Sequence, residues 1–200
     1  MAEPPAVPFV GLTGGMGAGK STALEALGRL GAATLSTDQV VHDLYGSPEV
    51  IEAVVERWGP EVAPDGAVDR GAIARRAFAD EAEREWLESL LWPLVAAEVA
   101  GFRSAALEAE PAPPAMVVET PLLFEAGMES AYDATIVVVT EDELRRRRSA
   151  ERGHEASQER HERQLSQEEK AARATFVVEN DGSVEELEAA LAGVLARLRE

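Results

Sequence analysis

The 200-residue chain contains no cysteine and only two lysines, Lys20 and Lys170. Without cysteine it cannot form disulfides, use a thiol nucleophile or bind a metal through thiolates, and this composition fits a cytosolic protein. Basic residues are scarce overall, because 19 Lys and Arg stand against 37 Asp and Glu, for a formal net charge of −18. A chain this acidic repels phosphate backbones and anionic membranes, so we expect neither nucleic acid nor a membrane as a partner.

Long hydrophobic runs are also missing. The most apolar stretch, residues 90–99, is interrupted by Pro93 and Glu98 and is too short to span a bilayer. The first eight residues contain three prolines and no basic residue, which does not fit a secretory signal. Hydrophobic residues nevertheless make up 46% of the chain, enough for a buried core. The sequence therefore predicts a soluble, cytoplasmic protein.

Short apolar runs alternate with segments of helical periodicity. Strands are expected at residues 9–13, 33–37, 116–119, 135–139 and 176–179. Helices are expected over 21–30, after Asp38, and from Ser183, where Glu186 completes a capping box. This alternation predicts an α/β fold in three layers, with a parallel five-stranded sheet that binds ligands at the carboxyl ends of its strands.

Two regions depart from the alternation. Residues 47–114 read as helical segments with a hairpin turn at Asp65-Gly66 and a long helix over about 80–108, in which Pro93 predicts a kink. Residues 141–174 are charged and helical with little apolar periodicity. We therefore expect a core made of residues 9–46, 115–140 and 175–200, a helical insertion over 47–114 and a separate helical region over 141–174.

One glycine-rich segment carries the clearest chemical signal. Residues 14–21, Gly-Gly-Met-Gly-Ala-Gly-Lys-Ser, satisfy the phosphate-loop pattern G-x-x-x-x-G-K-[ST]. In such a loop the backbone amides, the following helix N-terminus and the lysine surround a phosphate, and the serine reaches Mg²⁺. An accidental glycine turn is the alternative, but a strand before the segment and a helix after it argue against that. The expected ATP-binding residues are Gly14, Gly15, Gly17, Ala18, Gly19, Lys20, Ser21 and Thr22.

Several spaced motifs resemble those of the dephospho-CoA kinases. The segment 12–22, followed by Leu30-Gly31 and Asp38, is similar to the T-G-G-x-G-x-G-K-S-T loop and acidic D-x-D pair that open that family. Residues 121–125, Pro-Leu-Leu-Phe-Glu, resemble its P-L-L-F-E signature. Further matches in the right order cover nearly the whole chain from Phe9: Asp65-Gly66, Asp69-Arg70, Phe78, Leu87-Glu88, Pro93-Leu94, Arg160, Gln164, Glu169-Lys170 and Asn180-Asp181-Gly182.

The resemblance implies a P-loop kinase that phosphorylates the ribose 3′-hydroxyl of dephospho-CoA with ATP and Mg²⁺, the last step of coenzyme A biosynthesis. In that family the insertion binds the substrate, and the arginine-rich region, here with four consecutive arginines from Arg145, is a lid. By position alone Asp38 would cap a helix and the arginines would form a solvated face. The resemblance implies catalytic roles for Lys20, Asp38 and Arg148, ATP contacts for Arg147 and Arg152, metal contacts for Ser21 and Glu119, and substrate contacts for Asp38, Arg70, Trp92, Pro93 and Leu122.

Four positions depart from the family pattern. Ser36 replaces the first acidic residue of D-x-D, Glu119 with Thr120 replaces the aspartate before P-L-L, and Thr175 replaces an aspartate near the last strand. Trp92 stands where the family has histidine, and an indole cannot replace an imidazole as acceptor or cation. Two alternatives therefore stay open: a kinase for another small alcohol, nucleoside or nucleotide, and a nucleotide-binding paralogue with weak catalysis.

Overall fold

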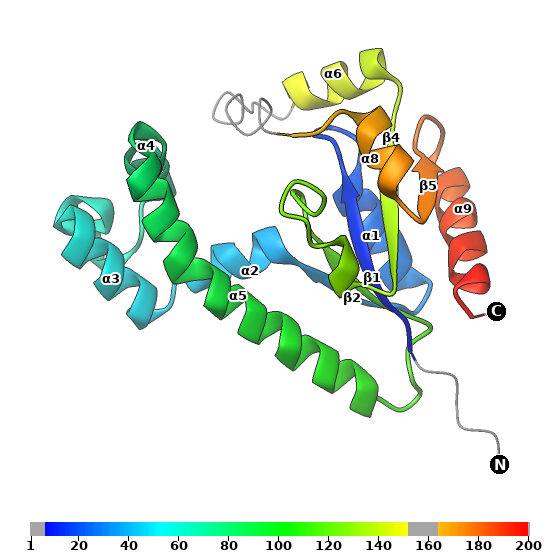
Figure 1. Ribbon diagram of the computed structural model, residues 1–200, viewed down its shortest axis with the longest axis horizontal. Helices are drawn as coiled ribbons and strands as arrows, with labels where there is room; N and C mark the ends of the chain where they lie inside the picture. The colour runs from blue at the N-terminus through cyan, green and yellow to red at the C-terminus, as the bar shows by residue number, and fades with distance from the viewer. Residues whose placement is uncertain (1–6, 152–163, 200) are drawn as a thin grey trace. The chain divides into compact units, whose positions relative to one another are not determined.

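The structure is a computed structural model that describes residues 7–151 and 164–199 (Figure 1). Its strands form one sheet in the order β2-β3-β1-β4-β5, and every pair is parallel. This confirms the predicted α/β fold and the five-stranded parallel sheet. The strands are β1 (Phe9–Gly14), β2 (Ala33–Ser36), β3 (Met116–Glu119), β4 (Ala134–Val139) and β5 (Phe176–Glu179).

Two helices cover one face of the sheet. Helices α1 (Lys20–Arg29) and α9 (Val184–Arg197) pack on the face to which Val10 and Leu12 of the central strand point. These strand side chains share one core with Leu27 of α1 and Leu191 of α9, and all four are completely buried. Because side chains alternate along a strand, residues two apart face the same layer. The start of α1 is thereby fixed at the carboxyl end of β1.

The segment after β3 contributes to the opposite face. The ring of Phe9 stacks on Tyr132 at a centroid distance of 4.9 Å, and the guanidinium of Arg103 lies 4.8 Å from the centroid of the same ring. A Cβ added to Gly11 would lie 2.4 Å from the side chain of Leu123, so this strand position has no room for a side chain. The chain between β3 and β4, which contains the short 3₁₀ helix η3 (Glu129–Ala131), is thus packed against β1.

The chain divides into two compact units. The first is formed by Met1–Ser36 and Arg103–Glu200, and the second by Thr37–Phe102. The second unit has its own core, in which Val54, Ile73 and Leu91 are buried. Its helices are α2 (Thr37–Leu44), α3 (Pro48–Trp58), α4 (Arg70–Ala79) and most of α5 (Glu81–Glu108).

The hairpin expected at Asp65-Gly66 is wrong, although the turn itself is present. Asp65 and Gly66 have φ values of 57° and 79°, as a tight turn requires. The flanking residues, however, form the 3₁₀ helices η1 (Pro60–Val62) and η2 (Pro64–Gly66) in place of strands. Pro60 and Pro64 lack the backbone N–H that a strand ladder needs. The Asp69 amide donates to the Val62 carbonyl oxygen at 2.9 Å across the turn.

Helix α5 (Glu81–Glu108) contains Pro93 in its interior, and its extent confirms the long helix expected over about 80–108. It is the one helix in the described part of the chain whose length and composition would allow it to cross a membrane. Leu87 and Leu91 of this helix are buried in the core of the second unit. Only 11% of its apolar window is buried, and length and composition alone are weak evidence for a membrane span.

Candidate active site

A glycine loop connects β1 to α1 at the carboxyl edge of the sheet. Gly19, the residue that caps α1, has φ 93° and ψ 28°, in the left-handed region that favours glycine. A Cβ at this position would also lie 2.1 Å from the side-chain nitrogen of Asn180. Gly17 has φ 77°, and a Cβ there would lie 2.6 Å from the carbonyl oxygen of Arg145. The loop is therefore closely surrounded, and the glycines are required by both conformation and space.

The first turn of α1 presents the polar groups expected of a phosphate site. The ammonium of Lys20 donates to the carbonyl oxygens of Gly14 and Gly15, at 3.1 Å and 3.2 Å, so its side chain curls back over the loop. Ser21 is exposed and Thr22 is half-buried beside it. A lysine, two hydroxyls and a helix N-terminus together form a site for a negatively charged ligand.

Residues that directly follow β4 and β5 form hydrogen bonds with the loop. The side-chain amide of Asn180 donates to the carbonyl oxygen of Ala18 at 2.8 Å. The hydroxyl of Thr140 lies 3.1 Å from the same carbonyl oxygen and 3.2 Å from that of Asn180. Arg148 donates to the Asn180 carbonyl oxygen at 2.9 Å. All of these groups except Arg148 are buried, so the loop is tied to two strands that are distant in sequence.

Helix α6 (Asp142–Glu151) places Arg145 beside the loop, in addition to the expected Arg147 and Arg148 of the same helix. A Cβ at Gly17 would lie 3.2 Å from Arg145 Cγ, and one at Gly15 would lie 3.9 Å from Arg145 Nη1. The side chain of Arg145 is 19% exposed and pairs with Asp142 at 2.9 Å, whereas Arg147 is exposed. Arg145 was not among the expected site residues, although it shares a helix face with Arg148 by its i,i+3 spacing. Arg152 lies outside the described residues.

The two candidate metal residues are a hydroxyl and a carboxylate. Glu119 is the last residue of β3, is 5% exposed, and lies in register with Leu12 of β1 and Ser36 of β2. The described residues contain no cluster of three or more Asp, Glu or His side chains that would enclose a metal. Oxygen donors from Ser21 and Glu119 suit Mg²⁺, which usually keeps several waters and takes its remaining ligands from substrate phosphates. The residues present therefore fit this ion.

Thr120, next to Glu119, is fixed by two contacts. Its backbone amide donates to the carbonyl oxygen of Leu12 at 2.9 Å, and its hydroxyl lies 3.0 Å from that of Tyr132. Burial raises the pKa of Tyr132, while the hydrogen bond with Thr120 acts in the opposite direction. Tyr132 therefore stays a neutral phenol, whose hydroxyl forms a hydrogen bond with the hydroxyl of Thr120.

The second unit carries four of the five residues expected to bind the substrate. Helix α2 begins at Thr37, so Asp38 lies exposed in its first turn and not at the cap position. His42 follows one turn later on the same face, and its Nδ1 is 2.6 Å from Nη1 of Arg70. Because a guanidinium only donates, this ring nitrogen is the acceptor. Trp92, 63% exposed, and Pro93 lie on α5, whereas Leu122 belongs to the first unit.

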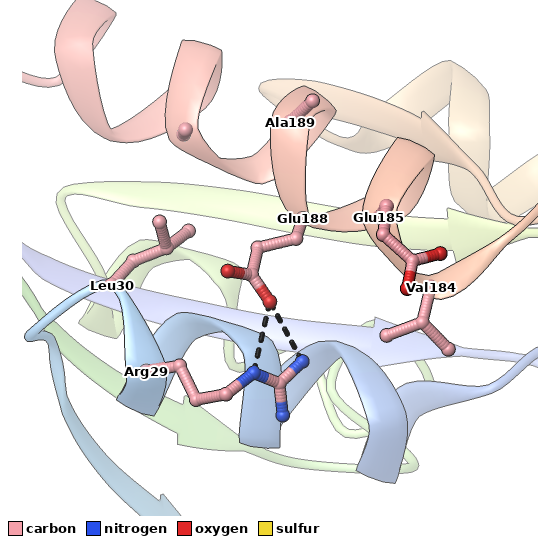
Figure 2. Close-up of a pocket in the computed structure, with 7 residues that line it drawn as sticks. Arg29, Leu30, Val184, Glu185, Glu188 and Ala189 are labelled. Carbon is pink, nitrogen blue, oxygen red and sulfur yellow. Dashed lines mark hydrogen bonds and ion pairs between the residues drawn. The ribbon is translucent and has the colours of Figure 1, made fainter.

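A surface hollow between α1 and α9 lies away from the phosphate loop. Arg29 and Leu30, at the C-terminal end of α1, and Glu188 and Ala189 of α9 line it, and Figure 2 shows Arg29 pointing toward Glu188. Arg29 and Glu188 form an ion pair of 2.8 Å across this hollow. The loop is at the opposite end of α1, a 10-residue helix about 15 Å long. The hollow is therefore separate from the phosphate site.

A central parallel strand that runs into a glycine loop, followed by a lysine and a hydroxyl at the start of a helix, defines the P-loop nucleotide-binding fold of small-molecule kinases. Within this class, a match to the family described as dephospho-CoA kinase extends over residues 8–186. The chain belongs to the dephospho-CoA kinase family.

Individual relatives agree with this assignment. A dephospho-CoA kinase of Jannaschia sp. is 39% identical over 175 residues, which cover 86% of this chain and 88% of the relative. The crystal structure of TT1252 from Thermus thermophilus has a TM-score of 0.79 and 36% identity, over 97% of this chain and all of that one. Dephospho-CoA kinase from Campylobacter jejuni has a TM-score of 0.67 at 24% identity, over 95% and 96% of the two chains, and shares the fold.

Proposed function

We propose that this protein transfers the γ-phosphate of ATP to the ribose 3′-hydroxyl of dephospho-CoA, which gives CoA and ADP in the last step of coenzyme A biosynthesis. The observation that carries the proposal is the phosphate loop of residues 14–19, buttressed by Asn180, in a chain of this family. The loop supports ATP as the phosphate donor. The name of relatives at 37% and 39% identity supports the acceptor.

ATP would lie along the loop, with its phosphates against the backbone amides and the N-terminus of α1. Lys20 would exchange its contacts with the Gly14 and Gly15 carbonyls for the outer phosphates, where its charge offsets the negative field of the chain. The ATP-binding residues proposed here are Gly14, Gly15, Gly17, Ala18, Gly19, Lys20, Ser21, Thr22, Arg147 and Arg152, and Arg145 joins them because of its place beside the loop.

Mg²⁺ would be held by Ser21 and, through water, by Glu119. When bound, the ion neutralises charge on the β- and γ-phosphate oxygens. Glu119 suits this role because it is buried at the carboxyl end of β3, the strand next to the one that leads into the loop.

Asp38 would accept the proton of the attacking ribose hydroxyl. That oxygen then forms a bond to the γ-phosphorus, and the bond from phosphorus to the bridging oxygen breaks as ADP leaves. Arg70, Trp92, Pro93 and Leu122 would bind the rest of the acceptor, and the guanidinium of Arg70 suits an anionic part of it. The insertion over residues 47–114 would thus be the acceptor-binding region.

Residues 141–174 would act as the lid, in which Arg147, Arg148 and Arg152 bring positive charge to the transferring phosphate. Arg148 is the proposed catalytic arginine of this region, and in the present structure it donates to the carbonyl oxygen of Asn180. Because Asn180 also holds the loop at Ala18, Arg148 is coupled to the phosphate site.

An ADP-release assay over a panel of acceptors tests the proposal. With Mg·ATP, dephospho-CoA should stimulate ADP release by the parent protein, and the Lys20→Ala variant should not respond. The panel should contain shikimate, gluconate, a nucleoside and a nucleoside monophosphate. Stimulation by one of these and not by dephospho-CoA would overturn the assignment of the acceptor, and ATP binding without any turnover would overturn the kinase assignment.

A different small alcohol or nucleotide acceptor is the second candidate. The observation that favours it is Trp92, a large apolar side chain 63% exposed on α5, where family members carry histidine. In either case we propose a small-molecule substrate, a cytoplasmic location and no nucleic-acid or membrane partner, in keeping with the net charge of −18.

A further inference from the structure

The second of the two lysines, Lys170, is completely buried. It lies in α8 (Gln167–Arg173), where its Nζ is 3.0 Å from the carbonyl oxygen of Pro121 and 3.0 Å from Oε1 of Glu125. Burying an ammonium costs several kcal/mol unless it is paired and hydrogen-bonded. A lysine at this position therefore needs a physical reason beyond filling space.

Stability alone is a poor reason for this buried pair. Oε1 of Glu125 accepts from Lys170 and from the Leu165 amide at 2.9 Å, but Oε2 is buried and has no hydrogen-bond partner in the described part of the chain. Half-satisfied buried ion pairs add little to stability, and apolar side chains of similar volume often replace them without loss. The contact with Pro121 offers a different explanation.

The carbonyl of Pro121 is held from two sides at the carboxyl edge of the sheet. The hydroxyl of Thr13, the residue before the phosphate loop, donates to it at 3.2 Å, and Lys170 donates at 3.0 Å. Hydrogen bonds from a charged donor are roughly twice as strong as neutral ones. Thr13 thus ties the chain two residues beyond Glu119 to the end of β1, and Lys170 ties the same carbonyl to α8.

One turn earlier, the same helix is attached to the strand on the other side of β1. Gln167 accepts from the Thr140 amide at 3.0 Å and donates to the Thr140 carbonyl at 2.9 Å. The Thr140 hydroxyl in turn reaches the carbonyl oxygen of Ala18 in the loop. We call Gln167 and Lys170 the α8 clamp, because together they join the segments that follow β3 and β4, the two neighbours of the central strand.

We propose that Lys170 is a positioning residue for phosphoryl transfer: by holding the Pro121 carbonyl it sets the place of Glu119 and Leu122 relative to the phosphate loop. The inference rests on the proposed function, since Glu119 and Leu122 are the residues assigned there to Mg²⁺ and to the acceptor. Lys170 acts through the backbone and touches no substrate. Replacing Lys170 should therefore change the Mg²⁺ requirement and kcat more than the KM for ATP.

Three variants test this inference. Lys170→Met removes the charge and the hydrogen bond, and Lys170→Met/Glu125→Met also removes the carboxylate that would otherwise be left buried and uncompensated. Arg173→Met is the matched control, because Arg173 binds Glu129 and lies over the Phe124 ring from the same helix without reaching Pro121. Each variant is measured below its unfolding transition, so that all remain folded.

The readouts are the unfolding midpoint, kcat and KM with dephospho-CoA, and the Mg²⁺ concentration that gives half-maximal ATP binding by calorimetry. Loss of an outer partner of a metal site commonly costs 10- to 100-fold in metal affinity or activity. We expect Lys170→Met to lower kcat and to raise the Mg²⁺ requirement by about 10-fold, while the KM for ATP stays within about twofold. The double variant should recover the unfolding midpoint but neither kcat nor the Mg²⁺ requirement, and Arg173→Met should match the parent in both.

The inference is overturned if the double variant regains both the parental unfolding midpoint and the parental Mg²⁺ requirement. It is also overturned if Lys170→Met has the same Mg²⁺ requirement as the parent. If Lys170→Met does not fold, the double variant decides alone. A parent protein that releases no ADP with dephospho-CoA would reject the proposed function, whereas the Mg²⁺ dependence of ATP binding needs no acceptor and still tests Lys170.

Discussion

The side-chain amide of Asn180 donates a 2.8 Å hydrogen bond to the backbone carbonyl of Ala18, a residue 162 positions earlier in the chain. The contact joins the end of β5 to the phosphate loop. It also fills the space beside Gly19, where a Cβ would lie 2.1 Å from the Asn180 nitrogen. The Asn180 side chain can bind Ala18 in this position because residue 19 has no Cβ, so both residues are needed for the conformation of the loop.

Replacing Gly19 with alanine should weaken ATP binding by about 10-fold or more. The left-handed backbone of a non-glycine residue costs about 1–2 kcal/mol, and the contact with Asn180 adds to it. Gly193→Ala in α9 is the control, since a Cβ there meets no atom within 4 Å. The control should keep its ATP affinity and gain about 0.5–1 kcal/mol in unfolding free energy. Calorimetry and denaturant unfolding measure both effects, and an unchanged affinity in Gly19→Ala would refute the prediction.

Asp38→Asn should bind ATP normally and lose about 10²-fold or more in kcat, the usual effect of removing a positioned base. Asp43→Asn is the control on the same helix, because Asp43 accepts a hydrogen bond from Gln39 at 2.8 Å and has no assigned role in the chemistry. Steady-state kinetics with dephospho-CoA compare the two variants. Near-normal turnover in Asp38→Asn would reject its assignment as the base.

Arg145→Met and Arg148→Met should each raise the KM for ATP or lower kcat by about 10-fold, since a hydrogen bond to a charged group contributes about 1.5–3 kcal/mol. Arg145 lies beside Gly15 and Gly17, and Arg148 contacts Asn180. Arg146→Met is the control, because Arg146 is exposed and donates to the Asp142 carbonyl of its own helix. If all three variants behave alike, these arginines have no specific role at the phosphates.

The stability of the folded protein should depend on pH through the protonation of Glu83. Its carboxylate accepts two hydrogen bonds from Arg57, at 2.8 Å and 3.0 Å, and one from the Trp58 ring at 2.6 Å. These contacts, led by Arg57, hold the pKa of Glu83 below its ordinary value. A lowered folded-state pKa stabilises the protein above the ordinary carboxyl pKa, and that stabilisation is lost as the pH falls through the folded value.

The Glu83→Gln variant should therefore unfold at a lower temperature than the parent at pH 7, and the difference should shrink toward pH 3. Thermal unfolding followed by circular dichroism over this pH range measures the difference directly. Glu85→Gln, an exposed position on the same helix, is the control and should track the parent. A gap between Glu83→Gln and the parent that stays constant with pH would show that the carboxylate charge does not matter.

Local patterns were enough to predict the elements that build the phosphate site. The apolar run at 9–13 became β1 because its residues are buried on both faces, as in other parallel strands. The Ser183 capping box is present as predicted, since it depends on residues three apart. The hairpin predicted at Asp65-Gly66 is wrong, because a local turn signal does not ensure that strands form on either side of the turn.

The sequence by itself determined the fold class and the phosphate loop, because alternation, glycine spacing and capping are properties of neighbouring residues. Only the tertiary structure decided which distant groups support that loop. It selected Asn180 and Thr140 behind Ala18, Arg145 beside Gly17, and Lys170 on the Pro121 carbonyl. The parallel order of the sheet brings the ends of β3, β1, β4 and β5 to one edge. Contacts made there join residues that no local spacing relates, so packing alone could specify them.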